Sequence, residues 1–89
     1  MSWTFLSNHG HVIIQLAKNP EIRIAELADL VGITERRASA IINDLKKQGY
    51  IEAEKVGRRN RYRVIEDAHL RHPLEDNCEI GAITALFQP

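Results

Sequence analysis

Residues 33–64 read ITERRASAIINDLKKQGYIEAEKVGRRNRYRV, and this stretch decides the fold. Its first half predicts a helix that opens at Thr34, where a hydroxyl can cap the first turn, and runs to about Gln48 before Gly49 closes it. Four apolar residues share one face of this helix at the i, i+3, i+4, i+7 spacing: Ala38, Ile41, Ile42 and Leu45. We expect that face to pack inward and the opposite face to meet solvent.

The second half of the stretch predicts a β-hairpin. Residues Tyr50–Val56 and Arg61–Ile65 alternate between apolar and polar side chains as strands do, and Gly57–Asn60 between them is typical of a turn. Four residues of the hairpin are expected to face the core: Ile51, Ala53, Tyr62 and Val64. The charged residues between them are then expected to point outward.

Two further helices are predicted before this stretch. Asn8–Ala17 has a helical apolar pattern with Ser7 or Asn8 as its N-cap, and an Asn-Pro pair ends it. Ala25–Val31 forms the second helix, and Gly32 supplies the left-handed conformation that turns the chain sharply into the next one. Two helices joined by so tight a turn form a helix-turn-helix. We therefore predict a mainly α fold with a small β wing (α+β): a winged helix-turn-helix with a three-helix core, a two-stranded hairpin and a C-terminal helix.

The net charge of zero hides an uneven distribution along the 89 residues. Residues 1–32 carry two basic and three acidic side chains, and residues 64–89 carry one basic and five acidic ones. Residues 33–63 carry nine basic and four acidic side chains, a net charge of +5. A cationic middle third between neutral and acidic flanks indicates one surface that faces a polyanion, although a solvated helix and hairpin would also be charged.

The outer face of the 34–48 helix has the composition of a DNA-reading surface. At 100° per residue, four residues lie opposite the apolar stripe: Arg36, Ala40, Asn43 and Lys47. Arg37 and Ser39 flank them. Arginine can donate two hydrogen bonds to guanine and asparagine can pair with adenine, so we predict Arg36 and Arg37, in the first turn, as the main base readers in a major groove. Asn43 and Lys47 are expected nearer the DNA backbone.

The predicted wing, residues 56–61, is basic at its tip. Arg58, Arg59 and Arg61 lie within four positions, which favours contact with phosphates or with a narrow minor groove over a loop that is polar only for solubility. The helix and the wing together predict a sequence-specific regulator of double-stranded DNA.

The C-terminal segment has a different character. Residues 1–66 are predicted to form the DNA-binding domain, and residues 67–89 a linker and a helix that starts near Pro73 and continues to about Phe87. An apolar surface on this helix and just before the first helix predicts a homodimer interface, made by Trp3, Phe5, Leu74, Ile80, Ile83, Leu86 and Phe87. The alternative is that the helix folds back on its own small domain.

The chain resembles winged helix-turn-helix transcriptional regulators of the MarR and ArsR kind. The resemblance covers nearly the whole chain, through WTFLSNHGHV at 3–12, GITERRA at 32–38, GRRNRYRV at 57–64 and RHPLE at 71–75. It implies a homodimer on palindromic operators. By position it implies major-groove contacts by Thr34, Arg36, Arg37, Ser39 and Ala40, and wing contacts by Arg58, Arg59 and Arg61. Many relatives have an extra helix for ligand or dimer contacts where this chain has a short one, and we assign no small-molecule inducer.

Several other classes of function are disfavoured. No apolar run exceeds three residues, so we expect no membrane span, and the N-terminus lacks the pattern of a secretory signal. The single cysteine, Cys78, excludes an internal disulfide and is typical of a reducing compartment, so we expect a cytoplasmic protein. The four histidines and Cys78 lack the spacing of a zinc site, and we expect no metal and no cofactor. No nucleophile motif or phosphate-binding loop is present, so we expect no enzyme.

Two alternatives for the basic face remain. A winged helix can also serve as a protein-protein interaction module, in which the basic face meets an acidic partner. Exposed aromatic anchors would be typical of such an interface, and the 34–48 helix has none in its sequence. RNA binding is disfavoured because a helix of groove size suits B-form DNA.

Overall fold

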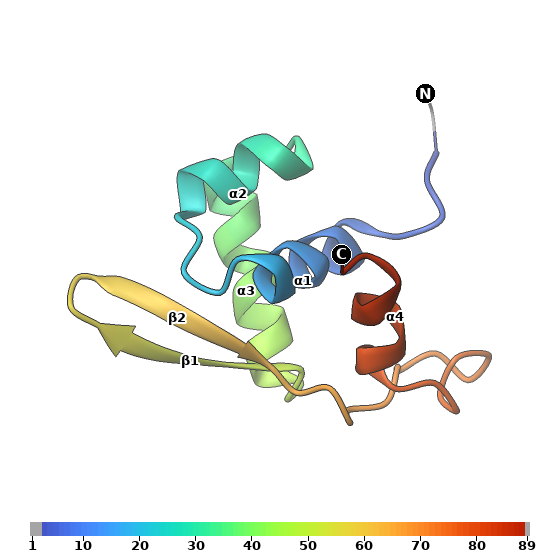
Figure 1. The fold of residues 1–89 in the computed structure, drawn as a ribbon. Coiled ribbons are helices and arrows are strands. Elements are labelled where there is room, and N and C mark those ends of the chain that lie inside the picture. The colour runs from blue at the N-terminus through green and yellow to red at the C-terminus, as the bar shows by residue number, and fades with distance from the viewer. Residues whose placement is uncertain (1–2, 89) are drawn as a thin grey trace.

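The computed structural model describes residues 3–88, and three helices form its centre (Figure 1). The elements follow the order α1 (Asn8–Lys18), α2 (Ile24–Val31), α3 (Glu35–Lys47), β1 (Ile51–Val56), β2 (Arg59–Val64) and α4 (Ile80–Leu86). Helices α1, α2 and α3 pack on one another, the β1-β2 hairpin leaves this core as a wing, and α4 packs against α1. This is the winged helix-turn-helix that the sequence predicts, and the fold class is confirmed.

The helix boundaries follow from capping residues. The Ser7 hydroxyl accepts a hydrogen bond from the Gly10 N–H at 3.3 Å, which makes Ser7 the N-cap of α1. At the end of α2, Gly32 takes a φ of 85°, and its N–H donates to the Ala28 carbonyl at 2.8 Å. A residue with a Cβ rarely adopts this conformation, so glycine sets the sharp turn between α2 and α3. The helix-turn-helix is thus built as predicted.

Helix α3 is fixed at its start and along its inner face. The Thr34 hydroxyl accepts a hydrogen bond from the Arg37 N–H at 3.0 Å and caps the first turn. The predicted apolar stripe of α3 is buried, with at most 6% of any of its residues exposed: Ala38, Ile41, Ile42 and Leu45. This stripe meets apolar residues of α1, α2 and the hairpin in one core cluster. Leu16 of α1 and Leu27 of α2 are fully buried in the same cluster.

The hairpin is tighter than its sequence suggested. Strands β1 and β2 are antiparallel, and Val56 pairs with Arg59 at the tip. The turn therefore contains only Gly57 and Arg58, whereas a four-residue turn up to Asn60 was predicted. Gly57 has a φ of 65°, and a glycine with positive φ at the first central position permits a two-residue turn that matches the twist of the strands.

Only the base of the hairpin packs on the helices. Ile51 and Tyr62 are buried and Val64 is partly buried, as predicted. Ala53 pairs with Tyr62 and so shares its face, but it is exposed, and its predicted place in the core was wrong. Figure 1 shows the reason, because the outer part of the wing extends beyond the helices. The Tyr62 N–H donates to the Pro20 carbonyl at 2.8 Å and ties the wing to the α1–α2 connection.

The C-terminal helix is shorter than predicted. It begins at Ile80, whereas the sequence suggested a start near Pro73. Backbone hydrogen bonds explain the difference, since the Leu70 N–H donates to the Cys78 carbonyl at 3.0 Å and the Ile80 N–H to the Ala68 carbonyl at 2.8 Å. These bonds close a loop over residues 69–79 and leave its backbone non-helical. No helix within residues 3–88 is long and apolar enough to cross a bilayer.

The start of α4 folds back on its own domain. Ile80 is buried among the core residues, and Thr84, one turn later, is 3% exposed. The expectation that Ile80 contacts a second subunit was therefore wrong, because its side chain is already covered within one chain. The fold-back alternative holds for the first turn of α4, while Leu86 near its end is exposed.

Two leucines on α2 provide a test of this core. Leu27 is fully buried, whereas Leu30 is 61% exposed on the same helix. We expect Leu27→Ala to lower the free energy of unfolding by about 2–5 kcal/mol through lost burial and a residual cavity. Leu30→Ala is expected to change it by less than about 0.5 kcal/mol. Urea denaturation followed by circular dichroism measures both, and equal losses in the two variants would contradict the core described here.

Candidate nucleic-acid interface

Helix α3 presents a continuous polar face to solvent. Seven predicted contact residues are exposed on it or at its N-cap: Thr34, Arg36, Arg37, Ser39, Ala40, Asn43 and Lys47. Burial of the opposite stripe fixes the rotation of the helix, so these residues cannot turn inward without exposing the core. In the part of the chain that is described, Arg36 and Arg37 form no ion pair within 4 Å. Their guanidinium groups are available for an external acceptor.

An acidic residue at the edge of this face is hydrogen-bonded to a residue of another helix. The Asp44 carboxylate of α3 lies 2.9 Å from Nε2 of His9 on α1. The hydrogen bond to His9 is the main cause that lowers the pKa of Asp44, and the charges of His9, Arg37 and Lys47 act in the same direction. The pair joins the start of α1 to the polar face of α3.

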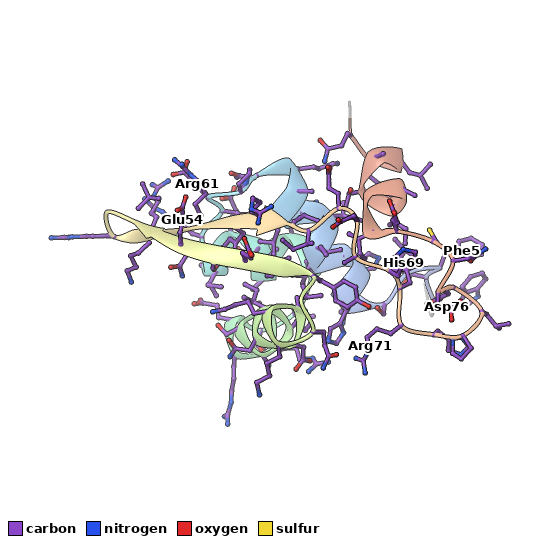
Figure 2. The ribbon with its side chains drawn as sticks, turned by 90° about the horizontal axis from the view of Figure 1, so that it is seen from below. Phe5, Glu54, Arg61, His69, Arg71 and Asp76 are labelled. Carbon is purple, nitrogen blue, oxygen red and sulfur yellow. The ribbon has the colours of Figure 1, made fainter. Side chains whose placement is uncertain are left out.

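Along its stem, the wing carries ion pairs. Glu52 pairs with Arg63, and Glu54 lies opposite Arg61 in the register, with a carboxylate–guanidinium distance of 3.9 Å. Arg61 also donates to Glu21 of the α1–α2 connection at 3.2 Å. Figure 2 shows Arg61 and Glu54 together on the wing. Arg61, a predicted DNA contact, is thus engaged by two carboxylates in the free protein.

The tip of the wing keeps its positive charge. Arg58 lies in the turn and Arg59 begins β2, and both are exposed. Unlike Arg61 and Arg63, neither forms an ion pair with any described residue. The stem is therefore nearly neutral while the tip is cationic, and a second positive site lies at the first turn of α3.

Five exposed apolar side chains, which we call the apolar surface, belong to the N-terminal arm, the 69–79 loop and the end of α4, segments that lie away from the wing tip (Figures 1 and 2). Phe5 is 94% and Leu74 is 87% exposed, and Trp3 stacks edge-on against Phe5 with ring centroids 5.1 Å apart. Leu86 and Phe87 are also exposed, while Ile83 is partly covered. Phe5 and Ile83 border a groove of about 510 Å³ that extends to His9 of α1 and Asp44 of α3. Of the predicted subunit contacts, all except Ile80 therefore remain accessible.

The histidines of the described chain do not gather with other residues into a metal-binding cluster. Among residues 3–88, no three histidine, cysteine or acidic side chains converge on a point that would hold a metal ion. His69 instead serves the 69–79 loop, where its Nδ1 lies 2.7 Å from the Asp76 carbonyl oxygen. Figure 2 shows these two residues at the end of the molecule away from Arg61.

Comparison with known proteins identifies the family. The profile of a family described as winged helix-turn-helix DNA-binding matches residues 7–52, just over half of the chain. The chain belongs to this family, and the matched residues include the whole helix-turn-helix. The predicted resemblance to winged-helix regulators is confirmed.

One curated relative and two solved structures resemble this chain. An uncharacterised protein of Methanocaldococcus jannaschii, MJ1254, is 31% identical over 67 residues, which cover 74% of this chain and 14% of that protein. This chain thus spans a small part of the length of that relative. A predicted DNA-binding transcriptional regulator from E. coli superimposes with a TM-score of 0.63 at 18% identity, over 88% of this chain and 70% of that one.

A second solved structure extends the comparison to the MarR family. The zinc-dependent MarR family transcriptional regulator AdcR, in its Zn(II)-bound state, superimposes with a TM-score of 0.53 at 23% identity, over 74% of this chain and 47% of that one. At these identities the two structures show a shared fold. The protein thus has the fold of a winged helix-turn-helix transcriptional regulator.

The ion pairs were the features that sequence analysis missed. A signal for the wing pairs exists, because Glu52 and Glu54 have the same two-residue spacing as Arg61 and Arg63. A two-residue turn sets a register that places each of these glutamates opposite its arginine. The four-residue turn that was predicted implies a different register, so the pairs were not predicted. The His9–Asp44 pair has no local signal, since the two residues are 35 positions apart.

The lowered pKa of Asp44 predicts a pH dependence of stability. A depressed folded-state pKa means that the ionised carboxylate stabilises the fold above its ordinary pKa, and that this contribution is lost as the pH falls through the lowered value. We expect Asp44→Asn to be less stable than the wild type at neutral pH, with the difference closing in acid. Denaturant unfolding across this pH range measures it. Asp29→Asn, at an exposed residue of α2, is the control, and a deficit of Asp44→Asn that does not vary with pH would contradict the assignment.

Proposed function

We propose that this protein is a sequence-specific, double-stranded DNA-binding transcriptional regulator that acts as a homodimer. Residues 34–48 enter the major groove, and the wing, residues 56–61, contacts phosphates or the minor groove. The main support for the proposal is the distribution of ion pairs among the arginines. The stem arginines of the wing pair with carboxylates, whereas the arginines of its tip and of the first turn of α3 do not. Unpaired guanidinium groups on two adjoining elements match the fork geometry of phosphate and guanine acceptors.

The face of α3 suits direct reading of bases. Arg36 and Arg37 lie in the first turn, which is the part of a recognition helix that approaches base edges. The small side chain of Ala40 follows one turn later and permits a close approach to the groove. Thr34 and Ser39 complete the major-groove contacts, and Asn43 and Lys47 extend the contact surface toward the backbone. These assignments make α3 the source of specificity.

The aromatic residues favour DNA over a protein partner at this face. Exposed aromatic side chains are typical anchors of protein interfaces. In the described chain, Trp3, Phe5 and Phe87 are the exposed aromatic residues, and they belong to the apolar surface at the other end of the molecule. We therefore assign protein contact to that end and nucleic acid to α3 and the wing.

The apolar surface supports self-association. A chain of this size has a small core, and a second copy would cover Leu74, Leu86 and Phe87, which one copy leaves exposed. We propose residues 1–66 as the DNA-binding domain and residues 67–89 as the main dimerisation element, with Trp3 and Phe5 from the N-terminal arm. Such a dimer would place two α3 helices on half-sites about 10 bp apart or a multiple of it. It would act by binding, without catalysis, in the cytoplasm.

Selection of bound duplexes from a random pool tests the proposed function. We expect enrichment of a palindrome with half-sites at that spacing, because the two recognition helices of a symmetric dimer read the same sequence in opposite directions. A pool that stays random after selection, although the protein is folded by circular dichroism, would contradict it.

Two arginine variants test the division of roles between helix and wing. We expect Arg36→Ala to reduce the preference for the selected duplex over a random one by about 1–3 kcal/mol, because a bidentate base contact is lost. Arg58→Ala is expected to weaken both duplexes alike and to lower the slope of log affinity against log salt by no more than about 0.9, the value for one phosphate. Fluorescence anisotropy measures both. Identical effects of the two variants on both duplexes would refute the division.

Matched substitutions test the dimer surface. We expect Leu86→Glu to shift the protein toward monomer in sedimentation equilibrium, because a charge placed in an apolar contact loses its hydration. Leu30→Glu, at an exposed leucine of α2 away from that surface, is expected to leave the association unchanged. A wild-type protein that sediments as a monomer, or equal effects of both variants, would contradict a homodimer built on this surface.

A further inference from the structure

A hollow of about 370 Å³ separates the wing from the start of α2. Figure 1 shows the α1–α2 connection passing above the hairpin, so this hollow opens where two segments far apart in sequence face each other. Arg58, Arg59 and Asn60 line it from the wing, and Arg23 lines it from the start of α2. None of the roles assigned so far involves Arg23.

Arg23 has no structural role that explains its presence. It is the N-cap residue of α2, yet it makes no capping hydrogen bond, because a guanidinium has no acceptor to offer the helix N–H groups. A positive charge is also unfavourable at this end of a helix, where the backbone dipole is positive. Its side chain is exposed and forms no ion pair within residues 3–88. Arg23 therefore does not stabilise the N-terminus of α2, and its guanidinium group is available for an external ligand.

The hollow keeps a net positive charge. Glu21 is the one carboxylate that lines it, and the Arg61 guanidinium, 3.2 Å away, engages that carboxylate. Arg23, Arg58 and Arg59 then remain without an acidic partner around one space. Three unpaired positive charges repel one another, and a bound anion offsets that repulsion. This arrangement therefore favours an anionic ligand.

Two contacts hold the walls of the hollow in place. The Tyr62 N–H donates to the Pro20 carbonyl at 2.8 Å, and Arg61 bridges Glu21 to Glu54 of the wing. Both contacts join the wing to the connection that leads into α2. The backbone of the wing is thereby held against the segment that carries Arg23 before any ligand arrives, which lowers the entropy lost on binding.

We propose that Arg23 and the wing-tip arginines Arg58 and Arg59 bind one and the same phosphate group of the DNA backbone. The inference rests on the proposed function, because it names a further residue of the DNA-binding surface. Guanidinium groups bind phosphate through paired N–H donors, and several around one phosphate fix its position. The shared phosphate anchors the wing to the helix-turn-helix on DNA and carries no sequence information.

A double-variant experiment tests the shared phosphate. The proteins are wild type, Arg23→Ala, Arg59→Ala and the double variant, measured by fluorescence anisotropy on selected and random duplexes between 50 and 200 mM salt. We expect Arg23→Ala to bind both duplexes about tenfold more weakly, the loss of roughly one hydrogen bond to a charged group. We expect the double variant to lose less than the product of the single losses, because both residues serve one ligand. Its slope of log affinity against log salt should fall by no more than about 0.9, the value for a single phosphate, because Arg58 still contacts that phosphate.

Controls separate the possible failures. Arg71→Ala removes an exposed arginine of the 69–79 loop, which Figure 2 shows apart from Arg61, and should weaken binding less than Arg23→Ala does. Thermal unfolding verifies that each variant is folded, and Arg23→Lys should recover part of the affinity. If Arg23→Ala matches Arg71→Ala, or the double variant loses a slope of about 1.8, the shared phosphate is refuted while the proposed function stands. If the wild type binds no duplex, the proposed function itself fails.

Discussion

The burial of one stripe of α3 is the constraint on which the rest of the structure depends. Ala38, Ile41, Ile42 and Leu45 are at most 6% exposed and meet residues of α1, α2 and the hairpin in a single core. Because this stripe cannot turn toward water without a large loss of stability, the opposite side of the helix is held outward. The exposure of Arg36, Arg37 and Asn43 is thus a consequence of packing.

Ion pairs on the wing determine where unpaired positive charge remains on the surface. Glu52 and Glu54 neutralise arginines along the stem of the wing, and Glu21 adds a second partner to Arg61. Exposed pairs of this kind stabilise a protein by only about 0–1 kcal/mol each, so their larger effect is on where unpaired charge remains. That charge lies at the tip of the wing and at the first turn of α3. A chain with zero net charge thereby acquires a local surface suited to a polyanion.

Sequence patterns predicted the elements that local chemistry determines. The caps at Ser7, Thr34 and Gly32 and the period of α3 gave helices within about two residues of those observed, because capping and amphipathicity act over one or two turns. The sequence patterns did not predict the features that depend on contacts between distant residues. The 69–79 loop is closed by backbone bonds between Leu70 and Cys78, so a proline that suits a helix start did not begin one. Likewise, Ala53 is exposed because the wing extends beyond the helices on which its base packs. The candidate contact residues were predicted from the face of α3, whereas the engagement of Arg61 was not.

We propose that the unpaired arginines of α3 and of the wing tip form one DNA-binding surface, separate from the apolar end of the molecule. Titration of the isotope-labelled protein with a selected duplex, followed by amide NMR shifts, tests it most directly. We predict the largest shifts in residues 23–24, 34–47 and 56–61, with few in residues 67–88. Shifts centred on residues 67–88, with α3 and the wing tip unaffected, would contradict it.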